Sequence, residues 1–240
     1  MIDIHSHILF DVDDGSDTIT ESVALIKSAL AAGVTEIILT PHYTGNTKED
    51  YRNENVDKHF SELVKQIKDR GIKINIYLGN EVAVYGNICD ILDTKVAKTL
   101  AGSRYMLIEF PMEADVNYCL DTVYEMKMRG ITPIIAHPER CECFKKDYSL
   151  VEKAVQEGAC IQVNVGSVFG DYGSKAKKIA RKLLKSKLVN FLAIDNHHII
   201  RDKYTDLPKR IRKLNRMFGA EYINGLTVYN QEKILRNEEI

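Results

Sequence analysis

The sequence lacks the features that mark several large classes of protein. Its 240 residues contain no apolar run near the roughly 20 residues of a membrane span. The formal net charge of -1 gives no excess of positive charge for nucleic acid or an anionic membrane surface. We also find no dinucleotide-binding fingerprint, internal repeat or low-complexity tract. These absences predict a globular protein with no nucleic-acid partner and no membrane insertion.

The chain has few cysteines, and no two of them form a C-x-x-C pair. An odd number at scattered positions is typical of free thiols in a reducing compartment, and the five are Cys89, Cys119, Cys141, Cys143 and Cys160. The first residues also lack the basic and apolar regions of a signal peptide. We therefore expect a cytoplasmic protein.

Short apolar runs alternate with helical patterns along the whole chain. The predicted strands are Ile2–His5, Glu36–Thr40, Ile74–Leu78, Tyr105–Glu109, Thr132–Ala136, Cys160–Asn164 and Asn190–Asp195. The predicted helices are residues 21–33, Val56–Asp69, Tyr118–Arg129, Ser149–Glu157, Lys175–Lys187 and a final helix in the tail from Gly219, including 231–240. Alternation at this spacing indicates parallel βαβ units, so we predict one domain over residues 1–240, of α/β class, built as a distorted TIM-like (β/α)7 barrel.

The predicted strands end on side chains that can bind metals. His5 and His7 lie on one face of the first strand, because successive side chains alternate between faces. The other strand ends carry His42, Glu81, Glu109, His137, Asp195 and His197. Parallel strands of a barrel present their carboxyl ends to one shared face, so we expect these side chains to converge.

Each of these residues has an ordinary structural explanation when it is taken alone. Glu109 could cap a helix, His42 could fill a turn, and Asp195 could be an N-cap. Together, however, several carboxylates buried in one place are costly unless cations compensate them. Mixed Asp, Glu and His ligands without cysteine suit manganese, iron or catalytic zinc, and clustered metals suit hydrolysis.

Six segments extend this pattern into a family resemblance. MIDIHSHILFDVDDG, TPHY, GNEV, IEFP, AHPER and IDNH resemble, in order and across essentially the whole chain, the PHP (polymerase and histidinol phosphatase) superfamily. Within it, the sequence is similar to the bacterial manganese-dependent tyrosine-protein phosphatases of capsular and extracellular polysaccharide clusters. The resemblance implies three divalent metal ions, with Mn²⁺ expected and iron, cobalt or zinc as alternatives.

The resemblance also implies a role for individual positions. One metal would be held by His5, His7, Glu81 and Asp195, a second by Glu81, Glu109 and His137, and a third by Asp14, His42 and His197. Asp13 competes with Asp14 for its role, and Asp14 is the position that matches the family ligand. Arg140 matches the arginine that reaches the phosphate, and Arg201 is the nearest candidate for a second such arginine.

The resemblance further implies attack on phosphorus by a metal-activated hydroxide, without a phosphoenzyme. The expected partner is the phosphotyrosine tail of a bacterial tyrosine kinase that regulates capsule or exopolysaccharide synthesis, and related proteins can form homo-oligomers. Three alternatives stay open: a phosphatase of a small metabolite such as histidinol phosphate, a phosphodiesterase or exonuclease, and a regulatory domain that binds phosphotyrosine without hydrolysing it. The fragment from Asp11 to Asp13 lacks the following Thr or Val expected of an aspartyl-phosphate phosphatase.

The cysteines give an argument that does not depend on the resemblance. A cysteine-based tyrosine phosphatase needs an arginine six positions after its nucleophile. The residues at that distance are Lys95, Glu125, Asp147, Ser149 and Gly166. None is an arginine, so metal chemistry is favoured over a thiolate nucleophile.

Two further segments invite a functional interpretation. Residues 175–187 contain seven basic side chains and no acid, which favours a solvated helix face over a surface for phosphorylated or acidic partners. Residues 163–173 predict a shaped loop, in which Asn164 and Ser167 satisfy backbone groups or contact substrate, with the first role favoured.

Overall fold

The computed structural model describes residues 1–45 and 53–240. Its strands are β1 (Ile2–Asp3), β2 (Glu36–Leu39), β3 (His42–Tyr43), β4 (Asn75–Leu78), β5 (Glu81–Ala83), β6 (Tyr105–Glu109), β7 (Thr132–Ala136), β8 (Cys160–Asn164) and β9 (Phe191–Ala193). Its α-helices are α1 (Ile19–Ala31), α2 (Val56–Asp69), α3 (Ile88–Thr94), α4 (Val116–Met128), α5 (Glu142–Lys146), α6 (Ser149–Gln156), α7 (Val165–Phe169), α8 (Gly173–Lys185), α9 (Leu207–Phe218), α10 (Ala220–Asn224) and α11 (Asn230–Arg236). Short 3-10 helices cover Asn53–Asn55, Leu100–Gly102 and Ile199–Arg201, and a π-helix covers Gly225–Tyr229.

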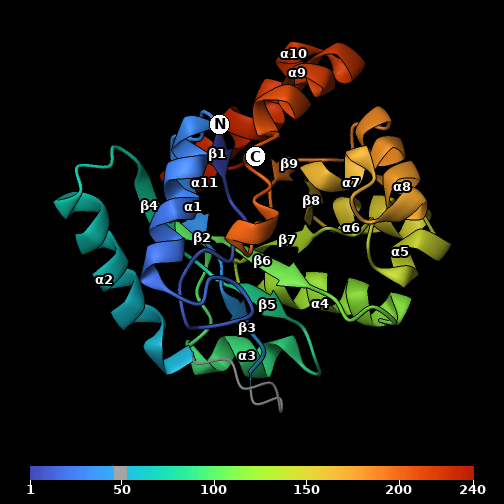
Figure 1. The fold of residues 1–240 in the computed structure, drawn as a ribbon. Coiled ribbons are helices and arrows are strands. Elements are labelled where there is room, and N and C mark those ends of the chain that lie inside the picture. The colour runs from blue at the N-terminus through green and yellow to red at the C-terminus, as the bar shows by residue number, and fades with distance from the viewer. Residues whose placement is uncertain (46–52) are drawn as a thin grey trace.

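The strands are all parallel and follow the chain order around the molecule (Figure 1). One sheet has the order β1-β2-β4 and the other β3-β5-β6-β7-β8-β9. A parallel bridge between Ser6 and Asn196 links the segments that follow β1 and β9, so the last strand returns to the first. Helices pack around the outside, as expected for alternating βα units. The predicted α/β class with a distorted, barrel-like arrangement is confirmed.

The barrel-like arrangement is distorted where two of its strands are interrupted. Pro41 separates β2 from β3, and Gly79 lies between β4 and β5. A Cβ on Gly79 would come within 2.8 Å of the Leu100 side chain and 3.2 Å of its Cα. A glycine is therefore needed where the segment around Leu100 crosses the broken strand.

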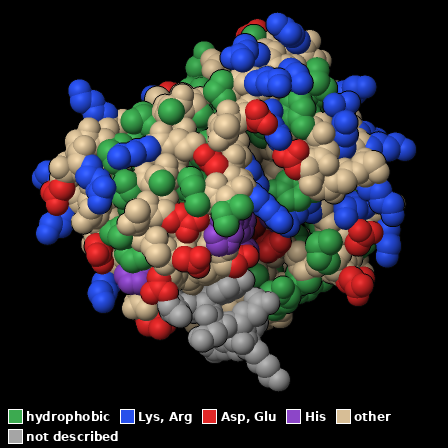
Figure 2. All heavy atoms as spheres, in the orientation of Figure 1, with side chains coloured by type: hydrophobic (Ala, Val, Ile, Leu, Met, Phe, Trp, Pro, Cys, Tyr) green, Lys and Arg blue, Asp and Glu red, His purple; other side chains and the backbone are tan. Residues whose placement is uncertain are grey.

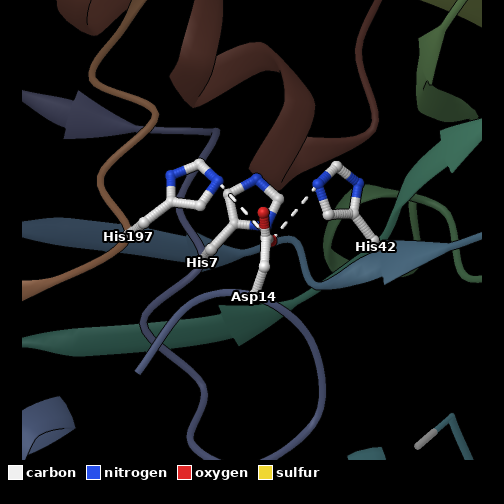
Figure 3. Close-up of side chains that lie close together, drawn as sticks. All are labelled: His7, Asp14, His42 and His197. Atoms are coloured by element: carbon white, nitrogen blue, oxygen red, sulfur yellow. Dashed lines mark ion pairs between the residues drawn. The ribbon is translucent and has the colours of Figure 1, made fainter. Parts of the chain in front are cut away.

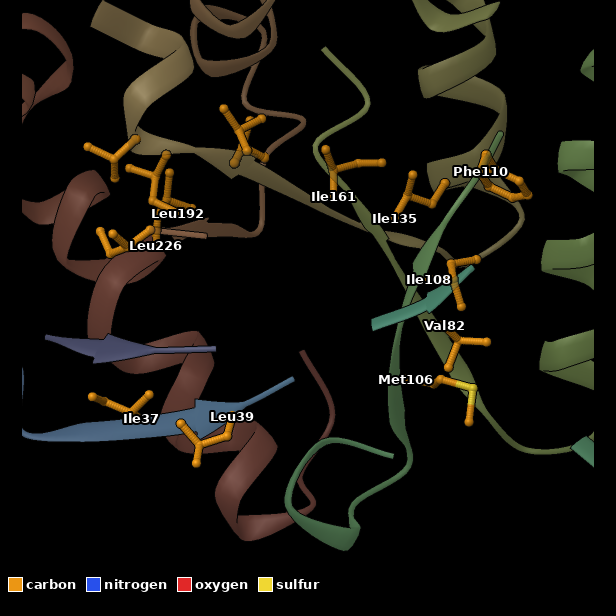
Figure 4. Packing of buried hydrophobic residues seen from close by; sticks show 14 of the residues in the cluster. Ile37, Leu39, Val82, Met106, Ile108, Phe110, Ile135, Ile161, Leu192 and Leu226 are labelled. Carbon is orange, nitrogen blue, oxygen red and sulfur yellow. The ribbon is translucent and has the colours of Figure 1, made fainter. Parts of the chain in front are cut away.

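Apolar side chains alternate between two cores, as the period of two in a strand requires. Ile37 and Leu39 belong to the larger cluster between strands and helices (Figure 4), whereas Ile38 belongs to the smaller cluster inside the ring of strands. The same alternation places Tyr105 and Leu107 inside, and Glu109 is the next residue of β6 in that series. The inner cluster thus forms the floor beneath the strand ends.

The structure confirms the seven predicted strand positions and the main predicted helices, with shifted ends. The sequence analysis missed the short strands β3 and β5 and the helices α3, α5, α7 and α9, whereas α10 and α11 lie in the tail that it predicted to be helical. The predicted loop over residues 163–173 is wrong, because Val165–Phe169 is a helix that ends at Gly170, where φ is 101°. All five cysteines are free, as predicted. Among the described helices, none combines the length and the apolar character that crossing a membrane requires.

Candidate metal centre

The strand ends bring all nine predicted metal-ligating side chains to one face of the ring. We divide them as the family resemblance does, into two inner groups that share Glu81 and one outer group near the surface; in the structure these groups adjoin, since His42 Nδ1 also lies 3.4 Å from Glu81 Oε2. We define the first inner group as His5, His7, Glu81 and Asp195, the second as Glu81, Glu109 and His137, and the outer group as Asp14, His42 and His197.

The first inner group is closely packed and almost wholly shielded from solvent. His5 Nε2 lies 3.2 Å from His7 Nε2, and each of these atoms lies 3.1 Å from Glu81 Oε2. Asp195 Oδ1 lies 3.6 Å from His5 Nε2 and 3.8 Å from His7 Nε2. No side chain of the four is more than 2% exposed. Four potential ligand atoms therefore face one another in a closed space.

The second inner group uses the other oxygen of Glu81. His137 Nε2 lies 2.9 Å from Glu81 Oε1 and 3.7 Å from Glu109 Oε1. Since Oε2 faces the first group and Oε1 the second, the Glu81 carboxylate is placed to bridge two cations.

The outer group is partly exposed to solvent, and Figure 3 shows Asp14 between His42 and His197. Asp14 Oδ1 lies 3.5 Å from His42 Nε2 and 3.7 Å from His197 Nε2. The side chains of Asp14, His42 and His197 are 56%, 14% and 25% exposed. The His7 ring lies between the inner and outer groups, with its centroid 4.0 Å from the His197 ring.

These distances suit shared divalent cations. Two ligand atoms about 2.1 Å from one ion are about 3.0 to 3.4 Å apart in octahedral or tetrahedral geometry, close to the spacings within each group. The charges point the same way: burial and the neighbouring Glu81 carboxylate raise the pKa of Glu109 to about 8. A divalent cation would offset this repulsion and keep Glu109 ionised as a ligand.

Residues behind the first group orient its ligands. His5 Nδ1 donates to Gln162 Oε1 at 3.0 Å, which leaves Nε2 free to bind a cation. The Gln162 amide donates to Asn164 Oδ1 at 2.7 Å, and the Asn164 amide donates to Asp195 Oδ2 at 2.6 Å. A hydrogen-bonded chain therefore connects two members of one group. Asn164 positions a carboxylate, which differs from the backbone role favoured by the sequence.

Asp13 and Asp14 take different positions. Asp13 Oδ2 accepts from His7 Nδ1 at 2.7 Å and from the His42 backbone N–H at 3.0 Å, so it orients His7 from behind. Asp14 instead faces the outer histidines. Gly15 makes the turn possible, because a Cβ there would lie only 1.8 Å from the His7 carbonyl oxygen.

Two members of the inner groups adopt a backbone conformation that is rare for residues with a side chain. The φ angles of His137 and Asp195 are 31° and 55°. Such angles cost on the order of 1 to 3 kcal/mol each and persist where the surroundings impose them. Here they turn both side chains from the strand ends toward the centre of the site.

The two predicted arginines lie in different surroundings. Arg140 NH1 donates to Asp195 Oδ2 at 3.0 Å, and its guanidinium stacks 4.7 Å from the Tyr172 ring centroid. Arg201 is exposed at the rim, where it lines a hollow of about 550 Å³ together with Asp14 and His197. The structure thus places Arg140 at the first inner group and Arg201 farther out.

The sequence analysis missed two side chains at this rim. Tyr172 donates to Asp195 Oδ2 at 3.2 Å, and Lys203 Nζ donates to the Tyr172 hydroxyl at 2.7 Å and to the backbone oxygen of Asp195. Both come from segments after a strand, where the strand periodicity gives no signal. The one sequence clue was the predicted shaped loop over residues 163–173, which contains Tyr172 and three glycines.

A barrel-like α/β fold with grouped histidines and carboxylates at its strand ends defines a metal-dependent hydrolase. The family comparison is more specific: the model for CpsB/CapC, capsular polysaccharide synthesis, matches residues 1–236. The chain belongs to the CpsB/CapC family.

Named relatives align over the whole chain. YwqE of Bacillus subtilis (strain 168), a tyrosine-protein phosphatase, is 32% identical over 242 residues, covering 100% of this chain and 93% of YwqE. CpsB of Streptococcus agalactiae serotype V, another tyrosine-protein phosphatase, is 34% identical over 252 residues, covering all of both chains.

Comparison with solved structures finds the same kind of protein. YwqE from Bacillus subtilis and CpsB from Streptococcus pneumoniae have crystal structures and are described as unique metal-dependent tyrosine phosphatases. A chain from these structures superposes on this one with a TM-score of 0.90 at 30% identity, covering 100% of this chain and 96% of the other. Histidinol phosphate phosphatase from Lactococcus lactis gives a TM-score of 0.58 at 12% identity over 91% of this chain and 95% of the other, a likeness of fold alone.

Proposed function

We propose that this protein is a metal-dependent protein-tyrosine phosphatase. The observation that carries the proposal is that the inner and outer groups converge beside Arg140. The chain that holds them aligns from end to end with tyrosine-protein phosphatases. Each group would hold one divalent cation, Mn²⁺ first, with iron, cobalt or zinc as alternatives. We treat residues 1–240 as one catalytic domain.

When bound, the divalent cations supply an acidified water as nucleophile and neutralise charge on the phosphoryl oxygens. Arg140 binds the non-bridging phosphate oxygens, because its planar fork suits them and its contact with Asp195 and Tyr172 holds it at the site. Arg201 reaches the phosphate or its flanking chain from the rim. No thiol enters the reaction, and the tyrosine leaves as a phenol whose pKa near 10 makes it a moderate leaving group.

The substrate we propose is a phosphorylated tyrosine on a bacterial tyrosine kinase that regulates capsular or exopolysaccharide synthesis. The names of the relatives and the family description support this substrate. We place the activity in the cytoplasm, in keeping with the five free cysteines. Self-association of the domain is part of the same proposal, carried by the family resemblance.

The test compares two substrates side by side. Phosphate release is measured from a tyrosine-phosphorylated kinase-tail peptide and from histidinol phosphate, each with Mn²⁺ and with EDTA. We expect release from the peptide, abolished by EDTA and restored by Mn²⁺. Preference for histidinol phosphate would contradict the tyrosine-specific proposal while leaving the metal assignments in place.

Two added measurements, peptide binding with other metals and incubation with single-stranded DNA, distinguish the remaining alternatives. A regulatory domain would bind the phosphopeptide without releasing phosphate under any of Mn²⁺, Fe²⁺, Co²⁺ or Zn²⁺. A nuclease would release nucleotides from single-stranded DNA. Either outcome would overturn the proposal.

A further inference from the structure

Helix α8 carries a basic surface that the proposed reaction does not use. A hollow of about 490 Å³ runs along this helix, and every charged residue that lines it is a lysine or an arginine. We define the α8 basic hollow by its lining residues: Ser174, Lys177, Lys178, Arg181, Lys182 and Lys185. Figure 2 shows Lys and Arg side chains along the edge of the molecule where Figure 1 places α8.

The positive charges of the hollow are left without acidic partners by the fold. Within residues 1–45 and 53–240, none of its lysines or its arginine forms an ion pair with a carboxylate. Arg181 donates to the Val168 carbonyl at 3.1 Å, and Lys182 Nζ lies 3.5 Å from the Tyr148 ring centroid. The opposite face packs inward through Ala176, Ala180, Leu183 and Leu184. Like charges gathered without compensation attract an anion from outside.

The position of α8 connects the hollow with the metal centre. The helix begins at Gly173, directly after Tyr172, whose hydroxyl donates to Asp195. At about 1.5 Å of rise per residue, Lys177 and Lys185 lie roughly 7 and 20 Å along the helix from Tyr172. An extended peptide covers about 3.3 Å per residue. The hollow therefore corresponds to positions about two to six residues from a phosphotyrosine in the site.

We propose that the α8 basic hollow docks an Asp/Glu-rich segment of the same phosphoprotein whose phosphotyrosine occupies the metal centre. This inference rests on the proposed function. Lysines outnumber arginine four to one in the hollow, and they act as flexible point charges without the rigid fork that selects a phosphate. Such a surface fits an extended run of carboxylates. Carboxylates also stay charged as phosphate groups are removed, so docking persists through the reaction.

The experiment compares three phosphotyrosine peptides on wild type and on two charge-reversal variants. Each peptide contains one phosphotyrosine as the substrate residue, and the peptides differ in the residues on either side of it. These flanking residues are acidic in the first peptide, neutral in the second, and neutral with a second phosphotyrosine in the third. The test variant combines Lys178→Glu, Lys182→Glu and Lys185→Glu. The control variant combines Arg212→Glu, Lys213→Glu and Arg216→Glu on α9, which changes the net charge equally at exposed positions. Para-nitrophenyl phosphate reports the basal activity.

We expect the test variant to raise KM for the acidic peptide about 10-fold, because each of the three substitutions replaces an attraction for a carboxylate with a repulsion. The kcat should stay unchanged, as should KM for the neutral peptide and the rate with para-nitrophenyl phosphate. The control variant should change KM for the acidic peptide less than about twofold.

Three results would overturn the inference: no KM difference between acidic and neutral peptides, an equal effect of both variants, or preference for the second phosphotyrosine alone. The equal effect would indicate attraction by net charge, and the last result would identify a phosphate site. A wild-type protein that hydrolyses no phosphotyrosine peptide would contradict the proposed function itself. Hydrolysis without a peptide preference would contradict only the docking surface.

Discussion

The inner groups and the outer group of the metal centre contain the same kinds of side chain in opposite surroundings. No side chain of the first inner group is more than 2% exposed, and hydrogen bonds from His5 to Gln162 and from Asn164 to Asp195 hold its members. In the outer group, Asp14 is 56% exposed. In the second inner group Glu109 is 29% exposed, whereas His137 and the shared Glu81 are buried. Burial and orientation therefore predict two tightly held cations inside and one that exchanges readily at the surface. The predictions below test this contrast.

The largest effect is expected for Glu81→Gln, because Glu81 belongs to both inner groups. Removing its charge should release two cations and lower phosphatase activity by about 10³- to 10⁴-fold, on the order of 5 kcal/mol of transition-state stabilisation. Metal content by mass spectrometry and phosphate release measure the two effects. Glu62→Gln on the exposed face of α2 is the control. Retention of all metals in Glu81→Gln would refute the bridging role.

The next largest effects distinguish Arg140, a proposed phosphate contact, from His137, a proposed metal ligand. Arg140→Ala should keep the inner cations and lower kcat by about 10²- to 10³-fold, because it removes positive charge at the developing transition state. His137→Ala should lose metal and activity together. Arg201→Ala, at the rim, should raise KM more than it lowers kcat. Loss of metal from Arg140→Ala would show that its contact with Asp195 is structural.

Asp14→Asn should remove the outer cation alone. We expect activity about 100-fold lower, within the several kcal/mol that one metal supplies, and an otherwise unchanged inner metal content. Titration with a chelator should also remove one cation from wild type before the other two. If all three leave together, the contrast between inner and outer groups is wrong.

Gln162→Ala tests whether hydrogen bonding explains the stability of the inner site. The substitution breaks the hydrogen-bonded link between His5 and Asn164. Removing the hydrogen-bond partner of a metal ligand weakens metal binding by about 10- to 100-fold. We expect an effect near the low end, since Asp195 keeps its contacts with Arg140 and Tyr172. Competition with a fluorescent chelator gives the affinity. Gln66→Ala on α2 should leave it unchanged.

The last prediction concerns the pH dependence of stability beneath the site, with no direct effect on metal binding or turnover. Burial raises the pKa of Asp3 to about 6, despite a hydrogen bond from Tyr204 that favours ionisation. A raised pKa means that the folded state holds the proton more tightly, so this contribution is present below about pH 4 and lost as pH rises through 6. It is worth at most about 3 kcal/mol.

Asp3→Asn should remove that pH dependence. Urea unfolding of metal-free protein at pH 4 and pH 6.5 gives the free energy of unfolding for both proteins. Wild type should lose more stability than the variant between the two values. An equal change in both proteins would show that Asp3 does not titrate in this range.

The sequence predicted the residues at the strand ends well because the alternation of side chains along a strand and the parallel order of the strands determine their positions. Alternation in the extended segment that continues from β1 predicts His5 and His7 on one side, and parallel strands bring the other ligands at the strand ends to the same end. Gln162 was missed although it carried a signal, since a polar residue on the inward face of an apolar strand needs a partner. Tyr172 and Lys203 could not be found in this way, because their positions depend on how α7 and the segment after β9 pack.

Anomalous diffraction at the manganese edge, from crystals of Mn²⁺-loaded protein, tests the metal centre most directly. The account predicts three peaks: one among His5, His7, Glu81 and Asp195, one among Glu81, Glu109 and His137, and a weaker one among Asp14, His42 and His197. A brief soak in EDTA should remove the third peak first. Peaks elsewhere, or none at the inner groups, would contradict the account.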